Sequence, residues 1–154
     1  SLFPALNWNS DEFSCAIGYA NLKRLDQSNN LRKKFVFEFL KLLKKSKVCF
    51  NNDFHSGYAP FFLPIFVRLN KIKCSKLQFA RALKAEGVDL GEHYGCLVNV
   101  WPWTKKYLKD KFIARNSIQT RDNCFHLFLN ENYKKKHAQD IVSAILKVEN
   151  YYKS

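Results

Sequence analysis

Apolar residues recur at helical spacing near the start of the chain, and this pattern predicts a first helix. Four residues form the apolar stripe: Phe13, Ala16, Ile17 and Ala20. Asn9 or Ser10 is expected to cap this helix, because Glu12 stands three residues after Asn9, as in a capping box. Gly18 lowers helix stability, so we expect it to allow close approach of another backbone.

A second amphipathic helix is expected after a break or kink at residues 28–30, where Ser and Asn residues cluster. Its apolar stripe carries lysines on the opposite side, as is typical of a helix with one buried face. The stripe consists of Leu31, Phe35, Phe39, Leu42 and Leu43.

The middle of the chain predicts a strand followed by a short helix. After a polar loop at residues 51–57, residues 61–69 form an apolar run, which Pro60 and Pro64 assign to a sheet edge or a bulge. Ser75 can cap a helix that continues through Glu86 and stops at Gly87.

The last third of the chain predicts two more strands and a long final helix. Residues 88–100 indicate a strand and an irregular loop, and residues 101–103 (Trp-Pro-Trp) a rigid aromatic corner. Residues 105–115 are charged and partly helical, residues 124–129 alternate as a strand, and residues 134–152 form the helix. This order of elements predicts an α+β fold, with helices packed on a small sheet.

Composition describes one ordered domain with a basic surface. The chain has 154 residues, of which 47% are hydrophobic, and this length and composition suffice for a core. The net charge of +13 is compatible with nucleic acid, anionic lipid or a diphosphate as partner. Twenty of the 26 basic residues are lysines spread along the chain, and arginine is scarce, which argues against a nucleic-acid reader.

The cysteines and histidines suggest no metal site. Five cysteines lie among apolar neighbours without CxxC spacing, which indicates reduced, buried thiols and a cytoplasmic protein. His93 with Cys96 and Cys124 with His126 could supply four metal ligands, but their spacing matches neither common zinc pattern. The longest apolar run is too short to span a bilayer, so we expect no membrane segment.

Several segments resemble a known family. Residues 6–18 (Leu-Asn-Trp-Asn-Ser-Asp-Glu-Phe-Ser-Cys-Ala-Ile-Gly) form a loop that enters the first helix, and residues 22–26 (Leu-Lys-Arg-Leu-Asp) continue this run. Residues 83–94 place Leu-Lys-Ala-Glu-Gly-Val before a His-Tyr pair, and residues 130–148 close the chain. Together, in this order, these segments resemble the C-terminal part of the DegT/DnrJ/StrS family of sugar aminotransferases.

The resemblance implies the small C-terminal domain of the aspartate-aminotransferase (type I) fold, with long N-terminal helices on a mostly antiparallel sheet. Residues 1–50 would form the interdomain and dimer-interface loop and helices, and residues 51–154 the small α+β domain. The family binds pyridoxal 5'-phosphate through a lysine of a large domain, and that lysine's Gly-Glu-Gly-Gly motif is absent here. We therefore expect a portion of a larger enzyme that is inactive alone and carries no catalytic residue.

The resemblance also implies site residues. Asn7 matches an asparagine that reaches across a homodimer to the cofactor phosphate, and His93 and Tyr94 match a His-Tyr pair near the substrate pocket. The substrates implied are glutamate and a nucleotide-linked keto sugar. The sequence departs from the family at Asn9, where arginine is common, and at Gly95, where proline is usual.

Each of these assignments has an alternative. Asn7 could simply cap the helix, and the rings of His93 and Tyr94 could pack under the aromatic corner at residues 101–103. As a whole, the chain could be a non-enzymatic basic module that binds nucleic acid or a partner protein. Four aromatic residues could then stack bases, although such residues usually belong to a core or an interface: Trp8, Trp101, Trp103 and Phe125.

Overall fold

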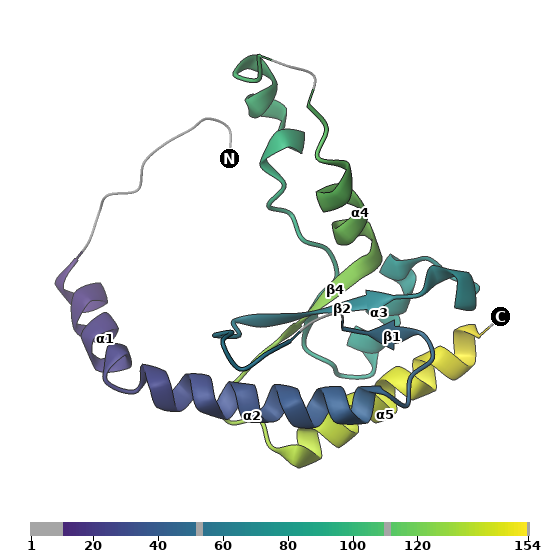
Figure 1. The fold of residues 1–154 in the computed structure, drawn as a ribbon, viewed down its shortest axis with the longest axis horizontal. Coiled ribbons are helices and arrows are strands. Elements are labelled where there is room, and N and C mark those ends of the chain that lie inside the picture. Colours follow the sequence, from purple (N-terminus) through teal and green to yellow (C-terminus); the bar gives the residue numbers. More distant parts are fainter. Residues whose placement is uncertain (1–10, 52–53, 110–111, 154) are drawn as a thin grey trace.

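The protein is an α+β unit in which three helices cover one face of a small sheet (Figure 1). A computed structural model describes residues 11–51, 54–109 and 112–153. The helices are α1 (Glu12–Leu22), α2 (Leu25–Leu43), α3 (Lys76–Ala85), α4 (Arg115–Asn123) and α5 (Lys135–Tyr152). The strands are β1 (Cys49–Phe50), β2 (Phe62–Val67), β3 (Leu90–Gly91) and β4 (Cys124–Phe128), and the 3-10 turns are η1 (Leu69–Lys71), η2 (Val98–Val100) and η3 (Pro102–Lys106).

The four strands form an antiparallel sheet in the order β1-β2-β4-β3. The register pairs Pro64 with His126 and Leu63 with Leu127 across β2 and β4, and it pairs Gly91 of β3 with His126. Because directly opposed residues share a face of a sheet, His126 stands between β2 and β3 on the face of Pro64. The Phe128 ring packs close to Gly91, where an added Cβ would lie 3.2 Å from that ring.

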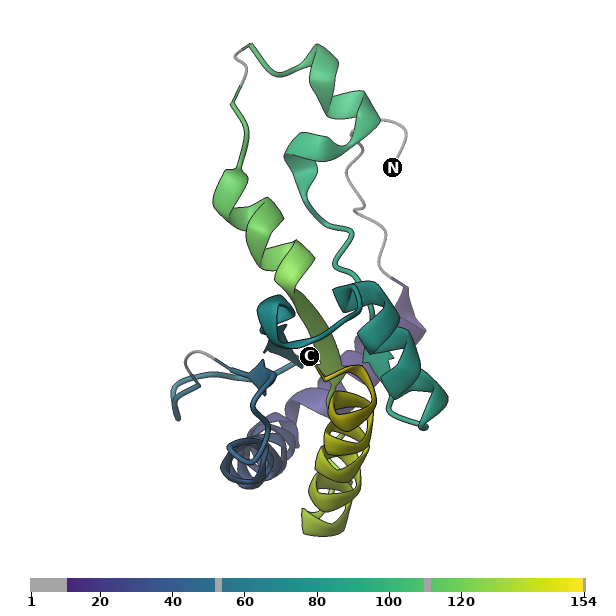
Figure 2. The same cartoon turned by 90° about the vertical axis from the view of Figure 1, so that its right-hand side faces the viewer.

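One face of the sheet forms the core with the helices. Burial alternates along β2, so that Leu63, Ile65 and Val67 point inward. Helices α2 and α5 lie side by side beneath this face (Figures 1 and 2). The largest fully buried rings come from three different elements: Phe39, Phe79 and Phe125.

Local signals at α3 are confirmed. The Ser75 hydroxyl accepts a bond from the Gln78 backbone N–H, and the Gln78 side chain accepts one from the Ser75 N–H, which completes a capping box. Gly87 follows the helix with φ +88°, the left-handed conformation that favours glycine at this position. The predicted strand at 61–69 and final helix at 134–152 correspond to β2 and α5.

Helix α1 differs from the sequence prediction in three ways. Asp11, not Asn9 or Ser10, caps it, and its carboxylate accepts the Ser14 N–H at 2.8 Å. None of its residues is buried, so the expected inward stripe is exposed in this chain. Among the described residues, a Cβ on Gly18 would meet nothing within 4 Å, so no described backbone approaches this glycine closely.

The break between the first two helices lies earlier than predicted. It falls at Lys23 and Arg24, and α2 continues without interruption through residues 28–30. The buried residues of α2 are Phe35, Val36, Phe39 and Leu43.

The segment between β3 and β4 projects from the sheet as an arm, defined here as residues 95–123 (Figure 2). It contains η2, η3 and α4, and α4 was not predicted, because its sequence has no apolar stripe. Within the arm, the Trp101 ring lies 5.6 Å from the Trp103 ring, as expected of an aromatic corner.

The proline prediction is partly right. By strand order β2 is an interior strand, but at Pro64 its only strand neighbour is β4, because pairing with β1 covers only residues 66 and 67. The Asn51 side chain donates to the Pro64 carbonyl at 2.8 Å on the side that lacks a strand. Pro64 therefore occupies a local edge.

The thiols are less uniform than predicted. Cys49 and Cys124 are buried and Cys74 is half-buried, but Cys15 and Cys96 are exposed, which contradicts the expectation for those two. Among the described residues, no helix combines the length and apolar character needed to cross a membrane.

Candidate functional site

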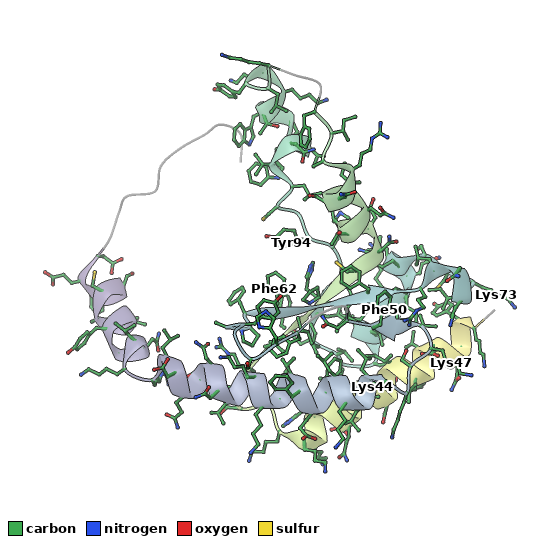
Figure 3. All side chains as sticks on the ribbon, viewed as in Figure 1. Lys44, Lys47, Phe50, Phe62, Lys73 and Tyr94 are labelled. Carbon is green, nitrogen blue, oxygen red and sulfur yellow. The ribbon has the colours of Figure 1, made fainter. Side chains whose placement is uncertain are left out.

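The sheet face turned away from α2 and α5 is lined with aromatic rings. The rings of Phe50 and Phe66 lie 5.6 Å apart at one end, and Phe62 lies at the other (Figure 3). Phe128 is 43% exposed and Phe61 is 77% exposed. An exposed set of large apolar rings on a sheet is typical of an interaction surface. We call Phe50, Phe62, Phe66, Phe128 and Tyr94 the aromatic face.

His93 and Tyr94 follow β3 directly, at the margin of this face, and their side chains have different neighbours. The Tyr94 ring lies 6.0 Å from the Phe62 ring and 5.2 Å from the His126 ring, and Tyr94 is 39% exposed. His93 instead faces α3, where Lys76 begins the helix. In the ring contacts of the described residues, neither ring is paired with the aromatic corner of the arm.

A buried lysine positions this loop. Lys76 is 5% exposed, and its ammonium donates to the Glu92 carbonyl at 2.7 Å. The same ammonium lies 3.4 Å from His93 Nδ1. The Glu92 carboxylate accepts from Arg81 Nε at 3.1 Å, so both the backbone and the side chain of Glu92 are bound to α3. The His-Tyr loop is therefore fixed against the helix.

The pKa values of both imidazoles near Lys76 are lowered. Burial lowers the pKa of His126, which is 7% exposed, and the charges of Lys76 and His93 lower it further. Partial desolvation and then the Lys76 charge lower the pKa of His93. Burial also lowers the pKa of Lys76 itself. Neutral imidazoles and a phenol can donate to and accept from hydroxyl groups, which is the chemistry that a sugar requires.

Cys124 and His126 lie close together in β4. The Cys124 sulfur lies 3.9 Å from His126 Nε2. Burial raises the pKa of the Cys124 thiol, which disfavours the thiolate. In the described part of the chain, no three His, Cys, Asp or Glu residues are grouped to hold a metal ion. Cys96 is exposed on the arm.

The remaining predicted residues fall elsewhere. Asn7 and Trp8 lie outside the described residues, so the predicted phosphate contact of Asn7 stays a prediction. Phe125 is 1% exposed in the core, which excludes it from a base-stacking platform. Trp101 donates its indole N–H to the Gly95 carbonyl at 3.0 Å and so stiffens the base of the arm.

Sequence reasoning missed Lys76. It is one of 20 lysines, and nothing in its neighbourhood in the sequence distinguishes it from the exposed ones. Its burial arises from tertiary structure, because β3 and the following loop fold over the start of α3. His126 did carry a signal, since a histidine inside an apolar strand is unusual, but the sequence alone pointed to a possible metal ligand there.

Comparison with protein families gives one match over most of the chain. The sequence model of the DegT/DnrJ/EryC1/StrS aminotransferase family matches residues 2–146. A search of the curated proteins finds no match.

Solved structures with the same fold are aminotransferases and related enzymes. The Helicobacter pylori aminotransferase PseC, involved in the biosynthesis of pseudoaminic acid, has a TM-score of 0.78 and 15% identity over 96% of this chain and 39% of its own. The aminotransferase from Psychrobacter cryohalolentis has a TM-score of 0.76 and 15% identity over 95% of this chain and 40% of its own. For Escherichia coli GDP-4-keto-6-deoxy-D-mannose-3-dehydratase with bound hydrated PLP, the TM-score is 0.72 and the identity 17%, over 93% and 37%. The chain thus spans about two fifths of the length of these structures.

Proposed function

Because this chain belongs to the DegT/DnrJ/EryC1/StrS aminotransferase family, we propose that it is the C-terminal portion of a pyridoxal-phosphate-dependent sugar aminotransferase. In this proposal the enzyme transfers an amino group from glutamate to the keto carbon of a nucleotide-linked sugar, in the cytoplasm. The chain supplies part of the substrate pocket, and a large domain supplies the cofactor lysine. Residues 1–50 form the interdomain and interface region, and residues 51–154 form the small domain.

The observation that carries the proposal is the aromatic face next to the His-Tyr loop. A helix-covered sheet with five exposed or half-exposed rings on its other face suggests a second layer, because apolar surface is stabilised by contact. The matched structures are much longer than this chain, which supports a large domain as the occupant of this face.

The residues described do not fit the cofactor by themselves. Pyridoxal phosphate forms a Schiff base with a lysine amine and needs donors for its phosphate. The one buried lysine among the described residues is Lys76, and its ammonium is already bonded to the Glu92 carbonyl. The contribution of this chain is therefore limited to binding and positioning.

The His-Tyr pair is the part of the pocket that this chain contributes. Tyr94 is fixed against Phe62 and His126 yet remains 39% exposed, so its phenol can bond a ligand while its ring is oriented. Desolvation and the neighbouring Lys76 charge lower the pKa of His93. The net charge of +13 favours the approach of an anionic nucleotide sugar. Asn7 would donate to the cofactor phosphate of the neighbouring subunit.

Helix α1 is proposed as the dimer contact. Its apolar side chains are strongly exposed: Phe13 is 83%, Ile17 is 62%, Tyr19 is 64% and Leu22 is 65% exposed. Small residues between them permit close packing of a partner, and the open space at Gly18 leaves room for a backbone. A free helix with such a surface would otherwise be marginal in water.

The experiment that tests the proposal starts from the DNA upstream of the Ser1 codon. We expect an open frame that encodes a lysine followed by the family's Gly-Glu-Gly-Gly motif. The protein expressed from that frame should show the absorbance band of a pyridoxal-phosphate aldimine and should transfer an amino group from glutamate to a nucleotide-linked keto sugar.

Site variants of that longer protein test the role of Tyr94 in substrate binding separately. Tyr94→Phe should raise KM for the sugar nucleotide, because it removes one hydroxyl from the pocket. Tyr107→Phe, an exposed tyrosine in the arm, is the matched control and should leave KM unchanged. Equal effects of both variants would refute the role of Tyr94, and a stop codon just upstream with no co-purifying large domain would refute the whole proposal.

A further inference from the structure

One end of the molecule gathers lysines that lie far apart in the sequence. The cations come from the end of α2 and its following turn, from the segment around η1, and from the end of α5. Seven lysines are exposed and one arginine is half-buried. We call this set the basic end: Lys41, Lys44, Lys45, Lys47, Arg68, Lys71, Lys73 and Lys153.

Backbone hydrogen bonds bring these three segments together. The Arg68 N–H donates to the Val48 carbonyl at 2.9 Å, and its guanidinium donates to the Lys47 carbonyl at 3.3 Å. The Lys73 N–H donates to the Tyr152 carbonyl at 2.8 Å, next to Lys153. Figure 2 views the molecule from this side, and Figure 3 labels three of the lysines there. The charges that look scattered along the sequence therefore share one end of the fold.

In the described part of the chain, no ion pair joins a carboxylate to a side chain of the basic end. Between Glu38 and Glu86 the sequence contains a single acidic residue, Asp53. At the end of α5, Glu149 is 5% exposed and accepts bonds from the Ser46 hydroxyl and the Lys47 N–H, so it serves the interior. Several exposed cations without exposed carboxylates among them create a local positive potential that attracts phosphate groups.

A hollow with aromatic walls lies beside these cations. It measures about 440 Å³ and is lined by Lys44, Phe50, Asn51, Phe54 and Arg68, among others. The Arg68 guanidinium lies 4.1 Å from the Phe50 ring centroid. An aromatic wall next to cations is the combination that receives an unstacked base with its phosphate.

We propose that the basic end binds single-stranded nucleic acid, with phosphates on the lysines and a base in the hollow at Phe50. The lysines supply the electrostatic attraction. The hollow makes the binding selective for an unpaired strand, because the bases of a duplex are stacked inside the double helix and cannot enter the hollow. The lysines of the basic end lie apart from the His-Tyr loop (Figure 3). Phe50 also belongs to the aromatic face, so this binding is proposed for the chain without a large domain over that ring. The sequence alone argued against nucleic-acid binding, because it does not show that these lysines lie together at one end of the fold.

The test measures fluorescence anisotropy of a labelled oligodeoxythymidylate with the whole chain at increasing salt. The basic-end variant combines Lys44→Glu, Lys47→Glu and Lys73→Glu. It should bind about tenfold more weakly or worse, and the slope of log affinity against log salt should fall by about two, at roughly 0.7 for each phosphate that the variant no longer neutralises. The matched control combines Lys105→Glu, Lys106→Glu and Lys109→Glu in the arm, with the same change in net charge, and should stay within about threefold of the original affinity.

A second variant tests the hollow. Phe50→Leu should weaken binding of the single strand severalfold and leave binding of a duplex of equal length unchanged, because leucine offers no aromatic ring on which a base can stack. Circular dichroism of each variant confirms the fold.

Three results would overturn the proposal. The arm control could lose as much affinity as the basic-end variant, which would show that the loss depends on the net charge of the chain and not on the position of the lysines. Phe50→Leu could leave single-strand binding unchanged or weaken duplex binding equally. Finally, the chain could fail to bind the oligonucleotide but bind phosphatidylserine vesicles through the basic end, which would assign the surface to anionic lipid.

Discussion

At the scale of single residues, Lys76 connects the fold to the candidate site. Its ammonium is buried at the start of α3, where it contacts the loop that carries His93 and Tyr94. An ammonium in this position costs free energy to bury, but it gains a charge-assisted bond to the Glu92 carbonyl. The residue therefore orders the loop and lowers the pKa of two histidines.

Lys76→Met tests this role, because methionine keeps most of the packing of the side chain and removes the charge. We expect the pKa of His126 and of His93 to rise, since the positive charge that disfavours the imidazolium is gone. Titration of the histidine proton resonances by NMR measures both values. Lys136→Met, at an exposed position on α5, should change neither, and unchanged histidines in Lys76→Met would contradict the assignment.

The buried imidazole also predicts the pH dependence of stability. The pKa of His126 is lowered in the fold, so the unfolded chain binds the proton more readily, and the free energy of unfolding falls as pH drops below about 6.5. The decrease approaches roughly 1.4 kcal/mol per pH unit for one proton.

His126→Asn should weaken this dependence between pH 7 and 5, above the range in which carboxylates titrate. Denaturant unfolding at several pH values measures it. A variant His126→Asn with the same slope as the original chain would contradict the neutral, buried imidazole.

At the scale of elements, the end of α3 depends on one backbone conformation. Gly87 has φ +88°, which places an L-residue in an unfavourable region whatever the space around it. Gly87→Ala should lower the free energy of unfolding by about 1 to 2 kcal/mol. Gly95→Ala, where a Cβ also meets nothing but φ is ordinary, should cost little. Chemical denaturation compares the two, and equal costs would contradict the left-handed cap.

Helix α1 allows its proposed role to be separated from folding. Because no α1 residue is buried, Ile17→Asp should leave the unfolding transition of the core unchanged but abolish dimers of the longer protein. Asn30→Asp in α2 adds the same charge at an exposed position and should keep the dimer. Sedimentation velocity distinguishes the species, and dimers that persist in Ile17→Asp would exclude α1 as the contact.

The elements differ in how far sequence could predict them. Long helices with one apolar stripe, such as α2 and α5, and the capped helix α3 were predictable, because their local signals agree with their packing. Strand β1 has only two residues and α4 has no apolar stripe, so tertiary contacts decide both. The apolar stripe of α1 is visible in the sequence. The pattern does not show whether such a stripe packs in the core of the chain itself or against a partner.

The candidate site shows the same limit. His93 and Tyr94 were found through a resemblance, whereas their packing with Lys76, Phe62 and His126 depends on the pairing of β3 with β4. Residues from four segments converge there, and no local pattern encodes that convergence. The basic end is a parallel case, since its three segments are distant in sequence.

At the scale of the whole molecule, the surfaces of the chain point to different partners. The aromatic face and α1 expose apolar groups that a further domain and a second subunit would cover, and the basic end exposes charge that phosphates would neutralise. The core itself is closed by helices on one side of the sheet. The central claim is that the reactive amine of the enzyme lies outside these residues.

Amino transfer by the chain alone tests that claim most directly. The chain is incubated with pyridoxal phosphate, glutamate and a nucleotide-linked keto sugar, beside the protein expressed from the longer reading frame. The account predicts aldimine absorbance and an amino-sugar product only with the longer protein, and disappearance of both when its motif lysine is replaced by alanine. A product formed by the isolated chain, with an aldimine on one of its own lysines, would contradict the account.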